Sequence, residues 1–185
     1  DMQHFISEQE YISLLPRLQA GQAHLVVPRQ VARNFFLRTS NHAIKQATGQ
    51  SALISKLIIW IGVITAPLLF LIAAIYFIID SGWAATIMVP LLGIFWTIIA
   101  GLTGDKGSFL KGTLASIAGA ILAAVLPAEY ATPLVLIVVS LWVQRNIFFI
   151  AEYFLLRMIS QSFAAFDMLI EHIEIIDSVP IEPNT

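Results

Sequence analysis

Residues 57–79 read LIIWIGVITAPLLFLIAAIYFII, a run of 23 residues without a charged side chain. As a helix this run would extend about 34 Å at 1.5 Å per residue, which suffices to cross roughly 30 Å of hydrocarbon. Two further uncharged stretches occupy 81–104 and 112–128, and a fourth apolar run begins near Pro133. The pattern predicts an all-α integral membrane protein, a bundle of four spanning helices.

The composition favours the same fold class. Of the 185 residues, 58% are hydrophobic and 12% are charged, against about 25% charged in a typical soluble domain. A soluble fold of this size could not bury so much apolar surface, so we expect the lipid bilayer to be its solvent. The formal net charge of −2 argues against a nucleic-acid partner. Because the chain contains no cysteine, disulfides, thiolate metal sites and iron–sulfur clusters are excluded.

The basic residues indicate the orientation. If the four stretches cross in turn, every Lys and Arg lies on one side of the membrane or at its boundary, and the other side receives only Asp80 and Glu129. Basic residues near spans resist translocation, so both termini are expected in the cytoplasm, with the protein in a bacterial inner membrane. The ten basic residues are Arg17, Arg29, Arg33, Arg38, Lys45, Lys56, Lys106, Lys111, Arg145 and Arg157.

Four regions are expected along the chain: a cytoplasmic helical region at 1–50, the spanning domain at 51–157, a cytoplasmic helix at 158–179 and a disordered tail at 180–185. From Pro133 to Val179 there is no further proline and no glycine. One helix of that length would extend about 70 Å, roughly twice the hydrocarbon thickness. We therefore expect a long fourth helix that crosses the membrane and projects into the cytoplasm.

Two helices are predicted within residues 1–50. Ser7 and Glu10 match a capping box, and the first helix is expected to end before Pro16. Pro28 suits the first turn of a second helix that runs to about Thr48, before Gly49.

That second helix carries four basic residues among its aromatic and aliphatic ones. Arg29, Arg33, Arg38 and Lys45 are candidates for contact with an anionic inner leaflet. The alternative is a helix that packs on its own cytoplasmic domain, because its apolar residues do not form one clean stripe.

Charged residues on the fourth helix are the candidate pore or relay site. At 100° per residue, Arg145 and Glu152 lie within about 20° of each other, and Arg157 follows. Charge within a membrane is a functional hypothesis by default. The alternative is a structural role at the interface, where Arg145 would snorkel if the span started near Ala128 rather than at Pro133.

The third span is rich in small residues. Ala115, Gly119 and Ala123 recur every four positions, a spacing that lets two helix backbones approach closely in lipid. The contact is expected either within one chain or between subunits.

The segment after Arg157 remains apolar, and an isolated helix could not leave such a surface exposed. The amino-terminal region, a second copy or another protein could cover it, and we expect a homo-oligomer. No catalytic residue, metal ligand set or cofactor site is predicted, since the four histidines, His4, His24, His42 and His172, lie outside the spans. The leading hypothesis is a non-enzymatic membrane-assembly subunit or signal-responsive effector that docks a cytoplasmic or membrane protein. An oligomeric ion channel or permeabilising pore is the alternative, and a membrane-embedded enzyme ranks third.

Overall fold

The computed structural model describes residues 7–82, 85–102 and 108–177, so the tail predicted at 180–185 lies outside the described residues. The described chain is mostly helical, with eight α-helices and one two-stranded sheet. The prediction of an all-α fold is therefore correct for the helical class and wrong in omitting the sheet. The chain divides into two compact units, residues 57–150 (unit 2) and the remainder from both ends (unit 1).

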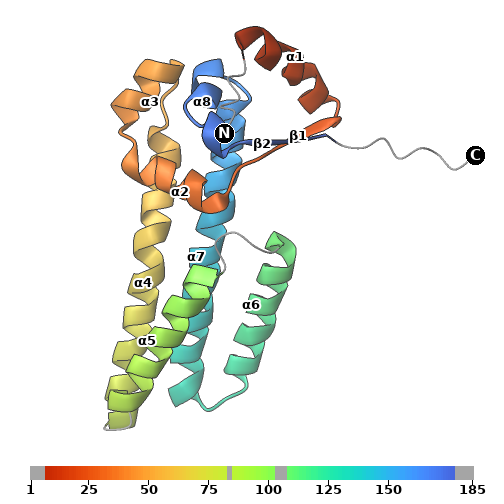
Figure 1. Ribbon diagram of the computed structural model, residues 1–185. Helices are drawn as coiled ribbons and strands as arrows, with labels where there is room; N and C mark the ends of the chain where they lie inside the picture. The colour runs from red at the N-terminus through yellow and green to blue at the C-terminus, as the bar shows by residue number, and fades with distance from the viewer. Residues whose placement is uncertain (1–6, 83–84, 103–107, 178–185) are drawn as a thin grey trace, which may run out of the picture. The chain divides into compact units, whose positions relative to one another are not determined.

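Unit 1 combines the two terminal regions of the chain. Its elements are α1 (Glu8–Gln19), β1 (Ala23–Val26), α2 (Arg29–Arg38), α3 (Asn41–Thr48), the end of α7, α8 (Phe163–Asp167), a 3-10 helix (Ile170–His172) and β2 (Glu174–Asp177). The strands pair antiparallel, with Ala23 opposite Asp177 and Leu25 opposite Ile175 (Figure 1). Arg17 of α1 forms an ion pair at 2.6 Å with Asp177, the last residue of β2.

The capping box predicted for α1 is confirmed. The backbone N–H of Ser7 donates to the Glu10 carboxylate at 2.8 Å, and the Glu10 N–H donates to the Ser7 hydroxyl at 3.3 Å. The predicted end before Pro16 is wrong, because α1 continues to Gln19. An interior proline removes one helical hydrogen bond, but the buried side chains of Tyr11 and Leu14 anchor the helix in unit 1.

The single helix predicted from Pro28 to Thr48 is also wrong, since α2 and α3 are separated at Thr39 and Ser40. The Ser40 hydroxyl accepts from the N–H of Ala43 at 3.1 Å and caps α3. The Lys56 ammonium donates to the backbone carbonyls of Phe36 and Thr39, which the break leaves without helical partners. The Ser40 cap on α3 and the Lys56 hydrogen bonds at the end of α2 therefore both stabilise the break.

The prediction that the fourth helix continues to Val179, and with it the helix predicted at 158–179, is wrong, whereas its extension into the cytoplasm stays a prediction. Helix α7 (Ala128–Ile159) ends well before Val179, and α8, the 3-10 helix and β2 follow. The Tyr11 hydroxyl donates to the Ile159 carbonyl at 2.7 Å, and the Ser162 hydroxyl caps α8. The chain turns because its apolar residues reach a core in unit 1, where Phe166 is fully buried.

Unit 2 is formed from four helices: α4 (Leu53–Ser81), α5 (Ala85–Leu102), α6 (Phe109–Ala124) and α7, of which α4 and α7 also extend into unit 1. Two helical stretches, Leu53–Asp80 and Glu129–Ile159, are long and apolar enough to cross a membrane. The apolar parts of α5 and α6 are shorter, at Ile87–Ala100 and Phe109–Ala124. These lengths give a weak indication of membrane association.

Helix α7 contacts each of the other three helices of unit 2 (Figure 1). The Ser140 hydroxyl donates to the Ala66 carbonyl of α4 at 2.6 Å and accepts from the Trp96 indole of α5 at 2.8 Å. Gly119 of α6 lies against Val138 of α7. A buried cluster of Ala73, Phe77 and Ile137 forms the core at the other end of these helices from Arg145.

Candidate functional site

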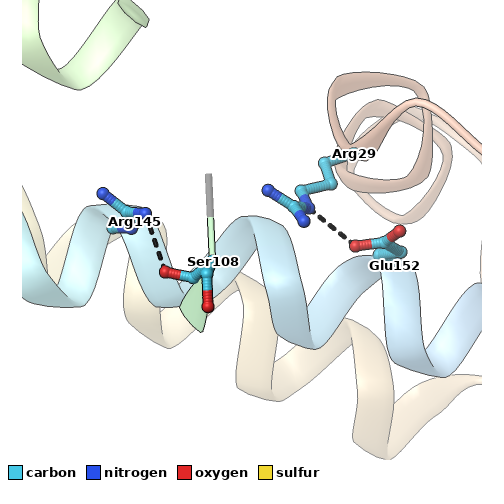
Figure 2. A network of polar contacts seen from close by, with 4 residues as sticks. All are labelled: Arg29, Ser108, Arg145 and Glu152. Atoms are coloured by element: carbon cyan, nitrogen blue, oxygen red, sulfur yellow. Dashed lines mark hydrogen bonds and ion pairs between the residues drawn. The ribbon is translucent and has the colours of Figure 1, made fainter. Parts of the chain in front are cut away.

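Arg145 of α7 packs against the first turn of α6. Its Nη2 donates to the Ser108 carbonyl at 3.0 Å (Figure 2), and its guanidinium lies 5.8 Å from the centre of the Phe149 ring. A Cβ atom on Gly112 would lie 2.3 Å from Nε of Arg145. Only glycine therefore leaves room for the arginine side chain in this position.

The contact at Gly112 buries part of the charge. Arg145 Nε has no hydrogen-bond partner in the described part of the chain. A cavity of about 210 Å³ lies beside it, lined by Ser116, Val138 and Leu141 among others. The sequence identified Arg145 but missed Gly112 and Ser108. The signal for Gly112 was its place four residues before Ser116 in a helix rich in small residues.

Asn146 of α7 is a buried polar residue that the sequence did not single out. Its side chain is 7% exposed, and its amide nitrogen has no hydrogen-bond partner among the described residues. Ser140 is fully buried, but its hydroxyl both donates and accepts a hydrogen bond. Because a buried polar group without a partner costs about 1–3 kcal/mol, Asn146 is a polar residue that its helix neighbours alone do not explain.

Glu152 has a different partner from Arg145, although the two residues share a helix. Its carboxylate accepts from Nε of Arg29 at 2.7 Å, and the two side chains are 23% and 18% exposed (Figure 2). The pair neutralises both charges within unit 1. The pore or relay role predicted for Arg145, Glu152 and Arg157 stays a prediction, but two of the three have structural partners.

Arg157 is exposed in the last turn of α7. It lines a cavity of about 470 Å³ with His24 and Tyr153, and another of about 400 Å³ with Gln50 and Gln161. A cation at the carboxyl end of a helix interacts favourably with the helix dipole. The helix dipole of α7 therefore gives a structural explanation for the position of Arg157.

The four basic residues predicted to meet a membrane surface fall into two groups. Arg29 is paired with Glu152, and Arg33 is partly buried, so that desolvation lowers the pKa of its guanidinium. Arg38 and Lys45 are exposed. Because α2 buries Phe35 and other apolar residues, the packed alternative describes α2, whereas a surface role for Arg38 and Lys45 remains a prediction.

The small residues of α6 are not equivalent. Gly119 contacts Val138, and Ala123 is buried, whereas Ala115 is exposed. The face turned to α7 is better described by Gly112, Ser116, Gly119 and Ala123, at intervals of four, three and four residues. These contacts favour the intramolecular alternative for Gly119 and Ala123.

Metal-binding groups do not gather in the described residues, which contain no set of three or more His, Cys, Asp or Glu side chains able to hold an ion. The charged side chains of α7 make an ion pair within unit 1, and a hydrogen bond and a close helix contact within unit 2. These contacts position the helices and hold the charged side chains in place.

Comparison with known proteins found no match to a family model, a curated protein or a solved structure.

Proposed function

We propose that the chain is a non-enzymatic inner-membrane protein that presents a folded cytoplasmic unit to a partner protein. Helices α4, α5, α6 and α7 would form a four-span bundle, and unit 1 would remain in the cytoplasm with both termini. The chain would act as a subunit of a membrane assembly or as an effector that responds to its partner.

The observation that carries this proposal is the contrast between the surfaces of the two units. Large apolar side chains are exposed along the helices of unit 2, with Ile79 at 72%, Leu122 at 71% and Val125 at 81%. Unit 1 exposes fewer large apolar side chains and buries Phe36, Phe166 and Leu155 completely. A soluble protein rarely exposes large continuous apolar patches, so lipid around unit 2 and water around unit 1 explain both surfaces.

The partners of the α7 charges support docking over conduction. Glu152 is bonded to Arg29, and Arg145 is bonded to the Ser108 carbonyl. Each of these contacts holds a charged side chain of α7 against a neighbour within the same unit. A conductance in liposomes that Arg145→Gln abolished would favour the pore alternative instead.

Self-association of the chain would use the exposed face of α6. The apolar segment after Arg157 packs within unit 1, so it does not require a second copy. Ala115 stays exposed on α6, where a small side chain would let another helix approach.

The topology can be tested directly because the chain contains no cysteine. Single variants Gln46→Cys on α3 and Val125→Cys after α6 would be treated in intact cells with a membrane-impermeant maleimide. We expect Val125→Cys to react and Gln46→Cys to react only after permeabilisation, since basic residues hold α3 inside. Labelling of Gln46→Cys in intact cells, or release of the protein by alkaline carbonate, would contradict the proposal.

A further inference from the structure

A cavity of about 610 Å³ opens in unit 2 where α4 ends and α7 begins. Its lining includes Phe77 and Asp80 from α4, Met88 and Leu92 from α5, and Glu129 and Tyr130 from α7. The volume lies within the range of about 300–1,000 Å³ that is typical of small-molecule sites. It is large enough for an organic ligand of drug size.

The cavity has an apolar floor and an amphipathic rim. Phe77 is 5% exposed at its base, whereas Met88 is 48% exposed and Tyr130 is 43% exposed at its edge. Most of the lining surface is apolar. A ligand must therefore bring a sizeable apolar body to fill the space.

Two carboxylates give the cavity its charge. Asp80 and Glu129 are exposed in the lining, and the described ion pairs, Arg17–Asp177 and Arg29–Glu152, involve neither of them. The sequence contains no Lys or Arg between Lys56 and Lys106 or between Lys111 and Arg145. Neither stretch that carries these acids can supply a counter-ion.

The helix termini make one of these charges costly. Glu129 lies in the first turn of α7, where the helix dipole favours an anion. Asp80 lies at the carboxyl end of α4, where the dipole disfavours one. A bound cation would offset the unfavourable placement of Asp80.

We propose that this cavity binds an amphipathic organic cation, with the apolar body on Phe77, Met88 and Leu92 and the positive charge beside Asp80 and Glu129. The exposed ring of Tyr130 at the edge of the cavity adds a favourable cation–π contact for a charge held near its face. A free metal ion would leave the apolar space empty, and an anionic lipid headgroup would be repelled by the carboxylates. The inference goes beyond the proposed function and requires only the fold of unit 2.

Two probes of matched size and opposite charge test this assignment. Tetraphenylphosphonium and tetraphenylborate would be titrated against the purified full chain in uncharged detergent, with protein-free micelles as the blank. We expect saturable binding of the phosphonium at one site per chain and no saturable binding of the borate. Asp80→Asn combined with Glu129→Gln should weaken phosphonium binding about tenfold, since each exposed carboxylate contributes modestly.

Two further variants separate the cavity from general surface charge. Met88→Trp should weaken phosphonium binding by filling the cavity without a change in charge, whereas Asp167→Asn removes an exposed carboxylate of unit 1 and should leave binding unchanged. The proposal is overturned if both probes bind alike, if the double variant retains full affinity, or if Met88→Trp binds as the unmodified chain does. Folding of each variant would be checked by its far-ultraviolet circular dichroism.

Discussion

Gly62 on α4 offers the sharpest test of helix packing in unit 2. The residue is buried, and a Cβ atom added there would lie 1.7 Å from Cδ1 and 2.6 Å from Cγ1 of Ile147 on α7. Ile147 is itself only 4% exposed, so its side chain has little space into which it can move. Gly62→Ala must therefore shift Ile147 or separate α4 from α7.

The magnitude follows from two opposing effects. Overpacking of this kind costs about 2 kcal/mol, and alanine gains about 1 kcal/mol over glycine in a helix interior. Gly62→Ala should therefore destabilise the protein by about 1 kcal/mol. In an Ile147→Ala background the nearest remaining Ile147 atom is Cβ, at 3.9 Å. The added methyl then fills part of the void, for a gain of about 1 kcal/mol, and adds to the helical gain.

The effect of Gly62→Ala on the free energy of unfolding should thus change sign, from a loss of about 1 kcal/mol to a gain of about 2 kcal/mol in the Ile147→Ala background. The four proteins of this cycle would be unfolded by sodium dodecyl sulfate in mixed micelles and followed by far-ultraviolet circular dichroism. Gly93→Ala on α5 is the matched control, because its Cβ would meet only Phe70 at 3.8 Å. The packing described for α4 and α7 is refuted if Gly62→Ala stabilises both backgrounds equally, as Gly93→Ala should.

Two further predictions concern unit 1. Glu152→Gln should destabilise the protein by about 1–3 kcal/mol, because it leaves a partly buried Arg29 without its carboxylate. A double-mutant cycle with Arg29→Gln, measured by chemical unfolding, should show coupling between the two residues. Additive effects of the two substitutions would exclude the ion pair. Burial raises the pKa of Tyr11 above its ordinary value of 10.0. As the pH rises, the folded state therefore retains the phenolic proton to a higher pH than the unfolded chain does. The resulting contribution to stability is complete below pH 10.0 and is lost as the pH rises towards the raised pKa. Tyr11→Phe should cost about 1–2 kcal/mol through the unpaired Ile159 carbonyl and should remove this alkaline loss, as measured by unfolding midpoints on either side of pH 10.0; an unchanged alkaline profile would contradict the assignment.

Features that depend on neighbouring residues were predictable from the sequence. The capping box of Ser7 and Glu10 spans three positions, and Gly49 ends α3 in the left-handed conformation with φ of 73°. Uncharged length likewise identified the helices of unit 2. In each case the information lies within one stretch of chain, so local physics suffices.

Features that depend on a distant partner were not predictable. The sequence from Pro133 to Val179 contains no proline or glycine after Pro133, yet α7 ends at Ile159. There the hydroxyl of Tyr11, 148 residues away in the chain, donates to the Ile159 carbonyl and caps the helix. The break between α2 and α3 depends in the same way on Lys56. Helical propensity was overruled by tertiary contacts in both places.

The candidate site shows the same division. Helical geometry places Arg145 and Glu152 on nearly the same face, but α7 contributes to both units, so the first side chain meets Ser108 and the second meets Arg29. A shared helical face therefore did not create a shared site. The packing of Arg145 against α6 further required Gly112, whose importance depends on a contact that the sequence alone does not contain.

The basic residues carry two roles that reinforce each other. A cation near a span opposes translocation whatever it contacts, yet Lys56 also donates to the carbonyls of Phe36 and Thr39, and Arg29 neutralises Glu152. Moving either residue across the membrane would require dehydration of its charge and loss of these bonds. If these cations set the proposed orientation, folding of unit 1 would strengthen that topology, because the folded unit holds Lys56 and Arg29 in these contacts.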